Sequence, residues 1–316
     1  MKIGVFLPIS GRAASRKTLM QAAQQAEALA YDSIWSADRI IIPWQIKTSY
    51  PYSKEATFIV PPDRPFFEPL TCLAFLAGCT EKIELGMSVM VLPYRHPLYW
   101  AKIATTIDHL SAGRLILGVG VGWMKEEFSA MGARFEERGK VSDEQLRLLD
   151  TIWQEEHATF HGQYYAFDDI AFSPKPHRKP RIPIWIGGEG KLAQRRAGIY
   201  GDAWFPYFVR ITPKELASRF ENVRRFAGEA GHDPDAVQLA CCLPVELTPK
   251  DVPQEKDYLK GSAVQIAEAL HGFQDIGVSH LGLQFMIPHW PERKEQIERF
   301  AKEVLPVFKR QASSSV

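Results

Sequence analysis

The chain has 316 residues, of which 46% are hydrophobic and 24% are charged, as in ordinary globular proteins. A formal net charge of +1 excludes a whole-molecule electrostatic attraction to nucleic acid or to an anionic membrane surface. No apolar run approaches the ~18 residues that span a bilayer, and MKIGVFLPIS at the start lacks the basic region and cleavage site of a signal peptide. We therefore expect a cytoplasmic protein with no nucleic-acid or membrane partner.

Short apolar runs alternate with segments of helical period along the whole chain. The runs are nearly continuous in apolar character, which is typical of parallel strands buried on both faces. Between them, stripes such as Leu216, Phe220, Val223 and Ala227 predict amphipathic helices, and Thr212 is a candidate N-cap. Eight runs are predicted strands: 2–8, 33–37, 83–92, 114–122, 182–188, 202–206, 237–247 and 280–286.

Eight strand–helix units predict an α/β fold in which the strands close into a (β/α)8 TIM barrel, whereas an open doubly wound sheet is the alternative. Three stretches are longer than the connections such units need: 40–67 after strand 2, 157–181 before strand 5 and 248–261 after strand 7. The second stretch is expected to contain a small hairpin around HGQYYAF. We expect one domain over residues 1–316, with a disordered tail at 311–316.

The four cysteines are Cys72, Cys79, Cys241 and Cys242. They form no Cys-x-x-Cys pair and have no nearby histidine at zinc-ligand spacing. Their apolar surroundings are typical of buried small side chains. We expect no metal site.

Polar residues follow two of the predicted strands. Asp38 and Arg39 come directly after strand 2, where the carboxyl ends of barrel strands carry catalytic groups. Strand 3 ends in Ser88-Val89-Met90 and leads through Arg95 to His96. Each segment also has an ordinary interpretation, namely a solvated loop for the first and a capped helix entry for the second.

Two glycine clusters stand at strand ends. Gly118, Gly120 and Gly122 fail the dinucleotide pattern G-x-G-x-x-G, because Trp123 occupies the place of the third glycine. We favour close approach of a ligand to the backbone there over simple relief of crowding. The second cluster, Gly187-Gly188-Glu189-Gly190, lies between a strand and a helix, where free backbone N–H groups and the helix dipole favour an anion such as phosphate. Glu189 would oppose that anion if its carboxylate pointed inward.

Together these segments resemble the luciferase-like monooxygenase family, and most closely its branch of oxidoreductases that use the deazaflavin coenzyme F420. The resemblance rests on KIGVFLP, Asp38, GMSVMVLPYRHP, HGQYYAF, PIWIGG and above all DHLSAGRLILGVGVGWMKEEF with the following ERG. It covers nearly the whole chain. It implies a TIM barrel whose mouth holds the flavin ring.

The resemblance also implies places for the cofactor. Family members commonly carry a bulge with a non-prolyl cis peptide at the end of strand 3, here Ser88–Val89, which backs the ring together with Met90. Asp38 would lie at the polar edge of the ring, and the residues of the second glycine cluster would receive the phosphate: Gly187, Gly188, Glu189 and Gly190. The expected cofactor is F420, with FMN as the alternative.

The chain departs from the better-known deazaflavin dehydrogenases at two proton-handling positions. Arg39 stands where several carry histidine, and Trp123 stands where the sugar-phosphate dehydrogenases carry glutamate. Neither side chain is a general acid–base near neutral pH. We interpret Arg39 as a holder of a substrate carboxylate or carbonyl and Trp123 as an apolar wall, with His96 as a further catalytic candidate.

These features predict hydride transfer between F420 and a small organic substrate. Aromatic residues of the 40–67 insertion, including Trp44 and Tyr50, are expected to roof the substrate pocket. The alternatives are an FMN-dependent monooxygenase of the same family and a flavin-binding protein without turnover. The family resemblance also implies a homodimer.

Overall fold

The computed structural model describes residues 1–52, 58, 60–207, 212–253 and 258–313. Its eight main strands form a parallel ring in which each strand pairs with the next. The pairings β9–β10, β10–β12 and β12–β1 close the ring. The closed ring confirms the TIM barrel and excludes the open doubly wound sheet. In ring order the strands are β1 (Lys2–Phe6), β2 (Ser33–Ser36), β3 (Glu84–Met87), β5 (Leu115–Gly120), β8 (Ile184–Ile186), β9 (Ala203–Trp204), β10 (Gln238–Leu247) and β12 (Val278–Phe285).

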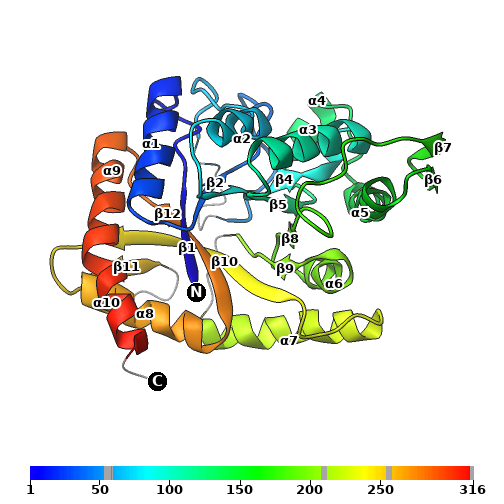
Figure 1. Ribbon diagram of the computed structural model, residues 1–316. Coiled ribbons are helices and arrows are strands. Elements are labelled where there is room, and N and C mark those ends of the chain that lie inside the picture. Colours follow the sequence, from blue (N-terminus) through cyan, green and yellow to red (C-terminus); the bar gives the residue numbers. More distant parts are fainter. Residues whose placement is uncertain (53–57, 59, 208–211, 254–257, 314–316) are drawn as a thin grey trace.

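Helices surround the ring (Figure 1). The first half of the chain contributes α1 (Arg16–Ala28), α2 (Pro69–Ala77), α3 (Pro97–Leu110), α4 (Lys125–Ala130) and α5 (Arg138–Gln154). The second half contributes α6 (Lys191–Tyr200), α7 (Pro213–Glu229), α8 (Ala263–Asp275), α9 (Trp290–Arg299) and α10 (Leu305–Ser313), the last two joined by the π-helical turn Phe300–Val304. Thr212 caps α7 through a capping box with Glu215, and the stripe predicted for this helix is buried.

Two of the three predicted insertions contain strands of their own. The stretch before β8 contains the antiparallel hairpin β6 (Ala158–His161) and β7 (Ala166–Ile170), which projects away from the barrel in Figure 1. The stretch after β10 adds the short strand β11 (Leu259–Gly261) to the outer side of the ring. Part of the stretch after β2 lies outside the described residues.

Two predicted boundaries need correction. The run predicted as strand 83–92 is interrupted: β3 ends at Met87, and β4 (Met90–Val91) resumes the pairing with β5. Residues 311–313, predicted as part of a disordered tail, are helical, because α10 continues to Ser313; residues 314–316 lie outside the described part. Adding a residue to an existing helix costs little free energy, so the polar residues at the end of this chain do not by themselves end the helix.

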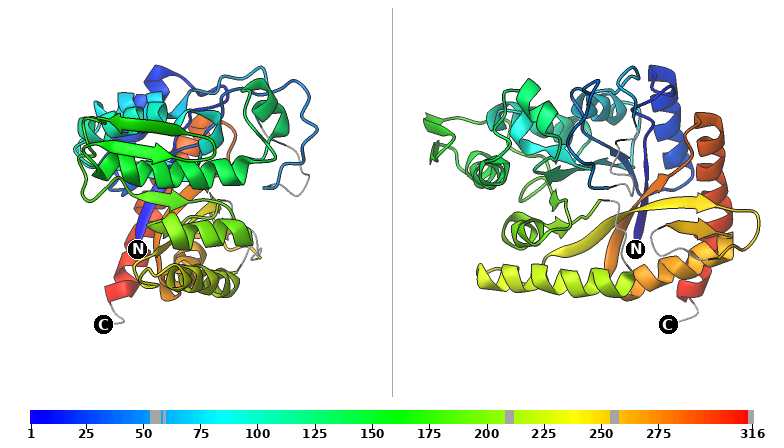
Figure 2. Two further views of the ribbon diagram at one scale, coloured as in Figure 1. Left: turned by 90° about the vertical axis from the view of Figure 1, so that its right-hand side faces the viewer. Right: turned by 180° about the vertical axis from the view of Figure 1, so that it is seen from behind.

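The first and last helices close the molecule on one side. Figure 2 shows α1 beside the helical segment that starts with α9. The Tyr31 hydroxyl donates to the carbonyl of Ile297 at 2.8 Å, and its ring stacks on Phe300. The two ends of the chain therefore pack against each other, which secures the β12–β1 seam of the barrel.

The interior of the barrel is aromatic. Trp35, Trp185 and Phe205 pack with ring centroids 4.8–5.3 Å apart, and their layer includes the buried imidazole of His280. The imidazole Nε2 lies 2.7 Å from the Ser33 hydroxyl. This filled layer forms the floor above which the cavity described next opens. In the part of the chain that the structure describes, no helix has the length and apolar character needed to cross a membrane.

Candidate active site

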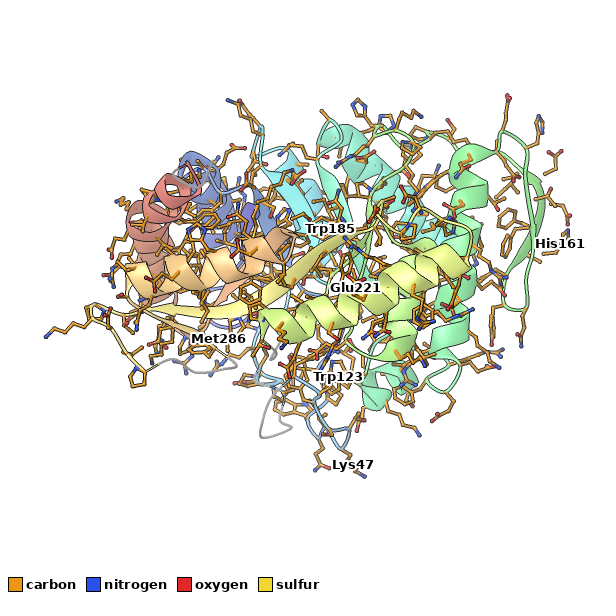
Figure 3. The ribbon with its side chains drawn as sticks, turned by 90° about the horizontal axis from the view of Figure 1, so that it is seen from below. Lys47, Trp123, His161, Trp185, Glu221 and Met286 are labelled. Carbon is orange, nitrogen blue, oxygen red and sulfur yellow. The ribbon has the colours of Figure 1, made fainter. Side chains whose placement is uncertain are left out.

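A cavity of about 1450 Å³ lies at the carboxyl ends of the barrel strands. Residues that follow β1, β2, β3, β5, β8, β9 and β12 all contribute to its wall. In Figure 3, Trp123 and Met286 mark two of the segments at the rim of the cavity. Both lie on the side of the molecule from which Lys47 projects. His161 lies far from them, on the hairpin. Since this end of a TIM barrel carries the active site, the cavity is the candidate site.

The break in the third barrel strand shapes the floor of the cavity. The Ser88–Val89 peptide is cis, as expected from the family resemblance, and both residues line the cavity. The Ser88 amide donates to the Ser36 carbonyl at 2.7 Å, which ties the break to β2. Met90, by contrast, is fully buried in the core around the barrel and does not line the cavity. Val89 is therefore the side chain that the break presents to the site.

Glycines of the next two strands in the ring, Gly120 in β5 and Gly187 directly after β8, make room for Val89. A Cβ on Gly120 would lie 2.8 Å from one Val89 methyl carbon, and a Cβ on Gly187 would lie 2.7 Å from the other. A Cβ on Gly118 would lie 2.0 Å from the carbonyl oxygen of Met87. The interpretation that a ligand approaches the β5 glycines is thus corrected for Gly118, which the interrupted strand approaches instead, whereas Gly120 also lines the cavity.

Asp38 is held in a buried ion pair. Its carboxylate accepts two hydrogen bonds from the Arg95 guanidinium, at 2.7 and 2.8 Å, and a third from the Val91 amide at 2.8 Å. Burial disfavours the charge of Arg95, yet the hydrogen bonds and charge of Asp38 raise the pKa of Arg95 above its usual value. Asp38 lines the cavity and at the same time fastens β4 to the end of β2.

Arg39 is also neutralised by a partner. Its Nη1 donates to the carboxylate of Glu127, which is fully buried in α4. The same carboxylate accepts from the backbone N–H of Ile40 at 2.7 Å and from the Tyr94 hydroxyl at 2.8 Å. The Arg39 guanidinium lies 5.2 Å from the Trp123 ring centroid. Arg39 lines the cavity, but its charge is directed to Glu127.

Aromatic rings form one wall of the cavity. Tyr50 packs against Trp123 at 4.9 Å between centroids, and Tyr52 packs edge-on against Tyr207 at 5.5 Å. Burial, reinforced by the charge of Glu189, raises the pKa of Tyr52 to about 12, so the Tyr52 hydroxyl is un-ionised at neutral pH. Tyr50 and Trp123 thus both line the cavity and contact each other, whereas Trp44, expected to roof the pocket with Tyr50, is 81% exposed and does not line it.

His96 lies outside the cavity. It caps the start of α3 without a side-chain hydrogen bond, is exposed, and packs edge-on against Tyr165 of the hairpin insertion at 5.3 Å. The helix that begins with Pro97 turns the imidazole away from the carboxyl ends of the strands. The structure therefore does not bring His96 to the other candidate residues.

The second glycine cluster forms a turn at the other end of the cavity. Gly188 has φ of +98°, and Gly190 caps α6, with no side chain bonded to the first helical N–H groups. The Trp204 indole N–H donates to the Gly188 carbonyl at 2.9 Å and holds the turn in place. Glu189 lines the cavity, and its carboxylate lies 3.3 Å from the Arg219 guanidinium of α7. A cation thus offsets the negative charge that would oppose an anion in this turn.

Cations from α5 and α6 stand beside the glycine turn. Arg138, Lys140 and Arg196 line this end of the cavity, and Arg196 is paired with Asp143 at 2.5 Å. None of these residues was singled out from the sequence alone. Arg138 lies in the ERG segment on which the family resemblance rests, so this motif could have pointed to it. No sequence motif points to Lys140 or Arg196. In the described ranges no group of three or more His, Cys, Asp or Glu side chains is arranged to hold a metal ion.

Comparison with known proteins decides the family. The sequence profile of the luciferase-like monooxygenases matches residues 1–255, which include the cavity-lining segments from β1 to β9. The chain belongs to the luciferase-like monooxygenase family.

Relatives within and around this family differ in what they do. The phthiodiolone/phenolphthiodiolone dimycocerosates ketoreductase of Mycobacterium tuberculosis is 28% identical over 291 residues, covering 88% of this chain and 75% of the relative. An F420-dependent secondary alcohol dehydrogenase, solved with an F420–acetone adduct, superposes with a TM-score of 0.78 at 20% identity and covers 97% of this chain and 98% of its own. A monooxygenase from Streptomyces bottropensis superposes equally well, with a TM-score of 0.78 at 18% identity over 98% of this chain and all of its own. The two superpositions show that these proteins share the barrel fold of this chain.

Proposed function

We propose that this luciferase-like protein is an oxidoreductase that transfers a hydride between coenzyme F420 and a small organic substrate. The observation that carries the proposal is the cavity floor, where a strand break presents Val89 and glycines of β5 and at the end of β8 accommodate it. Glycine-cleared apolar surface of this kind suits a flat ring, and the glycine turn at α6 suits an anionic tail. The names of the ketoreductase and the dehydrogenase point to the same reaction class.

The residues present fit such a cofactor in size and polarity. A volume of about 1450 Å³ exceeds the roughly 300–1,000 Å³ of a typical single-ligand pocket and leaves room for cofactor and substrate together. The Ser88 hydroxyl and the Arg138 Nε are both buried in the cavity wall and have no hydrogen-bond partner among the described residues. Buried polar atoms are normally satisfied, so these two mark places where a polar ligand is expected.

The cofactor supplies a two-electron hydride, and the protein supplies position and shielding. Val89 and its glycine neighbours support one face of the ring site, with Asp38 at its edge. The turn Gly187–Gly190, with Arg138 and Lys140 beside it, receives the phosphate. Tyr50 and Trp123 exclude water from the side where substrate enters.

The buried pairs limit the chemistry that the protein itself performs. Arg39 is committed to Glu127, so we propose that it positions the aromatic wall, with which it makes cation–π contacts, rather than holding substrate. Tyr207, whose pKa burial raises well above its usual value, donates to the Gln284 side chain at 2.8 Å. Among the described cavity residues outside these pairs, His289 before α9 carries an imidazole at the rim, whereas the main step of the proposed reaction is hydride transfer from the cofactor.

Equilibrium titration of the purified protein with F420 and with FMN tests the cofactor. We expect F420 to bind at micromolar or lower concentration and FMN to bind at least about tenfold more weakly, with loss of F420 binding in a Gly188→Val variant, since a β-branched residue does not adopt a φ of +98°. Tight FMN binding without F420 binding would overturn this choice.

The FMN-dependent monooxygenase remains the second candidate. The family description and the likeness to the Streptomyces bottropensis monooxygenase favour it. Oxygen uptake by the reduced FMN-loaded protein in the presence of substrate, with none by the F420-loaded protein, would select this function.

A further inference from the structure

The rim of the cavity carries an arginine whose charge has no counterpart. Arg293 lies in the first turn of α9, after β12, and lines the cavity. Its Nε donates to the Ile287 carbonyl at 2.7 Å, and its backbone N–H donates to the His289 carbonyl at 3.0 Å. These two bonds fix the stem of the side chain and leave both terminal Nη groups of the guanidinium available.

No described carboxylate forms an ion pair with Arg293, although the side chain is only partly exposed. Burial lowers the pKa of Arg293, and no neighbouring anion offsets the effect. An arginine nevertheless stays protonated at neutral pH, so the cavity wall keeps a desolvated positive charge. Arg39 and Arg196 differ from Arg293 in this respect, because they form ion pairs with Glu127 and Asp143.

The acidic residues of the cavity cannot provide the missing charge. Each of the four carboxylates on the described wall already contacts a cation: Asp38 with Arg95, Glu136 with Lys125, Asp143 with Arg196, and Glu189 with Arg219. The wall near Arg293 adds further positive charge instead. Arg12 follows β1, the strand that pairs with β12, and also lines the cavity. Arg64 lines it too, but its guanidinium lies 3.5 Å from the carboxylate of Asp63, so Arg12 is the residue that adds charge.

This positive region is separate from the glycine turn. Around the ring, β12 and β8 are separated by β9 and β10 on one side and by four strands on the other. The cavity wall also includes Tyr207 and the apolar rings of Phe6 and Trp290. A ligand group held at Arg293 is therefore different from the anion held at Gly187–Gly190.

We propose that Arg293 binds the acid group of the substrate, so that the substrate is an amphipathic organic acid with a carboxylate or phosphate head and an apolar body. The proposal rests on the hydride-transfer function above. A guanidinium with two free Nη groups meets a carboxylate or phosphate by two parallel hydrogen bonds. The aromatic wall of Tyr50 and Trp123 accommodates the apolar body.

Calorimetric titration with paired probes tests the proposal without turnover. The probes are acetate, butyrate and 4-phenylbutyrate, each with its neutral amide, and phenyl phosphate with phenol. We expect at least one acid to bind at least about tenfold more tightly than its neutral partner, since charge-assisted bonds to arginine are strong. Arg293→Gln should reduce this ratio to below threefold with the neutral probe unaffected, and Arg293→Lys should keep part of it.

Arg299→Gln is the matched control. Arg299 lies on the same helix but pairs with Glu303 outside the cavity, so its variant should keep the wild-type ratio. Wild-type protein with no acid preference, or an Arg293→Gln variant with an unchanged preference, would overturn the proposal. The carboxylate and phosphate probes identify which head group is preferred.

Cofactor titration of the same variants separates this proposal from the proposed function. Arg293→Gln should change the affinity for F420 or FMN by less than threefold. A tenfold loss of cofactor affinity with the acid preference intact would show that Arg293 serves the cofactor instead. If neither cofactor binds the wild type while the acid preference depends on Arg293, the oxidoreductase function fails and the anion site stands.

Discussion

Asp38 and Arg39 are neighbours in the chain, yet each side chain is neutralised by a different distant residue. Asp38 meets Arg95, and Arg39 meets Glu127, so two charges that could have served catalysis instead fix the wall of the cavity. Buried pairs of this kind are costly to break, because removal of one partner leaves an uncompensated charge. Chemistry at this site therefore depends more on shape than on titrating side chains.

The contact between Val89 and Gly187 gives the first prediction. Gly187→Ala places a methyl group 2.7 Å from a Val89 methyl carbon, so we expect a loss of about 1–3 kcal/mol in unfolding free energy from overpacking and at least about tenfold weaker cofactor binding. Adding Val89→Ala should recover part of the stability lost to Gly187→Ala. Urea unfolding of the two single variants and the double variant measures the coupling; additive effects would show that the two residues do not clash.

His96 gives the second prediction, which reverses the expectation from the sequence. Because the imidazole is exposed and faces Tyr165 rather than the cavity, His96→Asn should leave kcat and KM within about threefold of the wild type. A proton-transferring residue typically contributes about 10²–10⁴-fold. Steady-state kinetics on any accepted substrate distinguish a proton-transferring His96 from one outside the site. A loss of more than tenfold in kcat would show that His96 acts in catalysis.

At the scale of elements, the first turn of α4 fastens the insertion after β2. Glu127 accepts from the N–H groups of Ile40 and Ile41, and Glu126 accepts from the N–H groups of Lys47 and Thr48. Two adjacent glutamates thus replace the regular pairing that the insertion lacks. The loop that carries Tyr50 starts from these anchors.

Glu127→Gln tests the anchor. The substitution leaves Arg39 buried without its counter-charge, so we expect a loss of about 3–5 kcal/mol in unfolding free energy. Glu126→Gln, at a more exposed position, should cost about 1 kcal/mol or less. Combining Glu127→Gln with Arg39→Met should restore much of the loss; equal stability of the two single variants would argue against a special role for the buried pair.

For the whole molecule, the filled barrel interior controls how stability depends on pH. His280 lies in this interior, where burial, together with the charges of Lys2 and the N-terminus, lowers its pKa to about 3. In the unfolded chain the imidazole keeps its ordinary pKa near 6.5. As the pH falls below 6.5 the unfolded state takes up the proton first, so folding stability declines continuously until the pH approaches 3.

The fourth prediction follows from this difference. The contribution of His280 to the unfolding free energy should decline by about 1.4 kcal/mol per pH unit between pH 6 and pH 4. His280→Gln keeps a polar group toward Ser33 but does not titrate, so its stability should decline less steeply over the same range. Chemical unfolding of both proteins at several pH values measures the two slopes; parallel curves would contradict the assignment.

Much of the architecture follows from the sequence because its signals are local. Continuous apolar runs predict strands buried on both faces, and eight of them fall on the eight barrel strands. The family motifs also predicted the cis peptide at Ser88–Val89 and the turn at Gly187–Gly190, which the structure places in one cavity. Strand type and turn chemistry depend on neighbours a few residues away, so they can be read from the chain.

The charges of the site could not be assigned in the same way. Asp38 and Arg95 are 57 positions apart, and Arg39 and Glu127 are 88 apart, so only closure of the barrel decides which charges neutralise each other. The same closure turns His96 outward, moves the β5 glycines against the broken strand, and leaves Arg293 on the cavity wall without an anion. The sequence by itself determined the barrel and its glycine turn, because periodicity and turn residues act locally. Only the tertiary structure decided which polar groups remain available for a ligand, because that depends on which distant strands become neighbours.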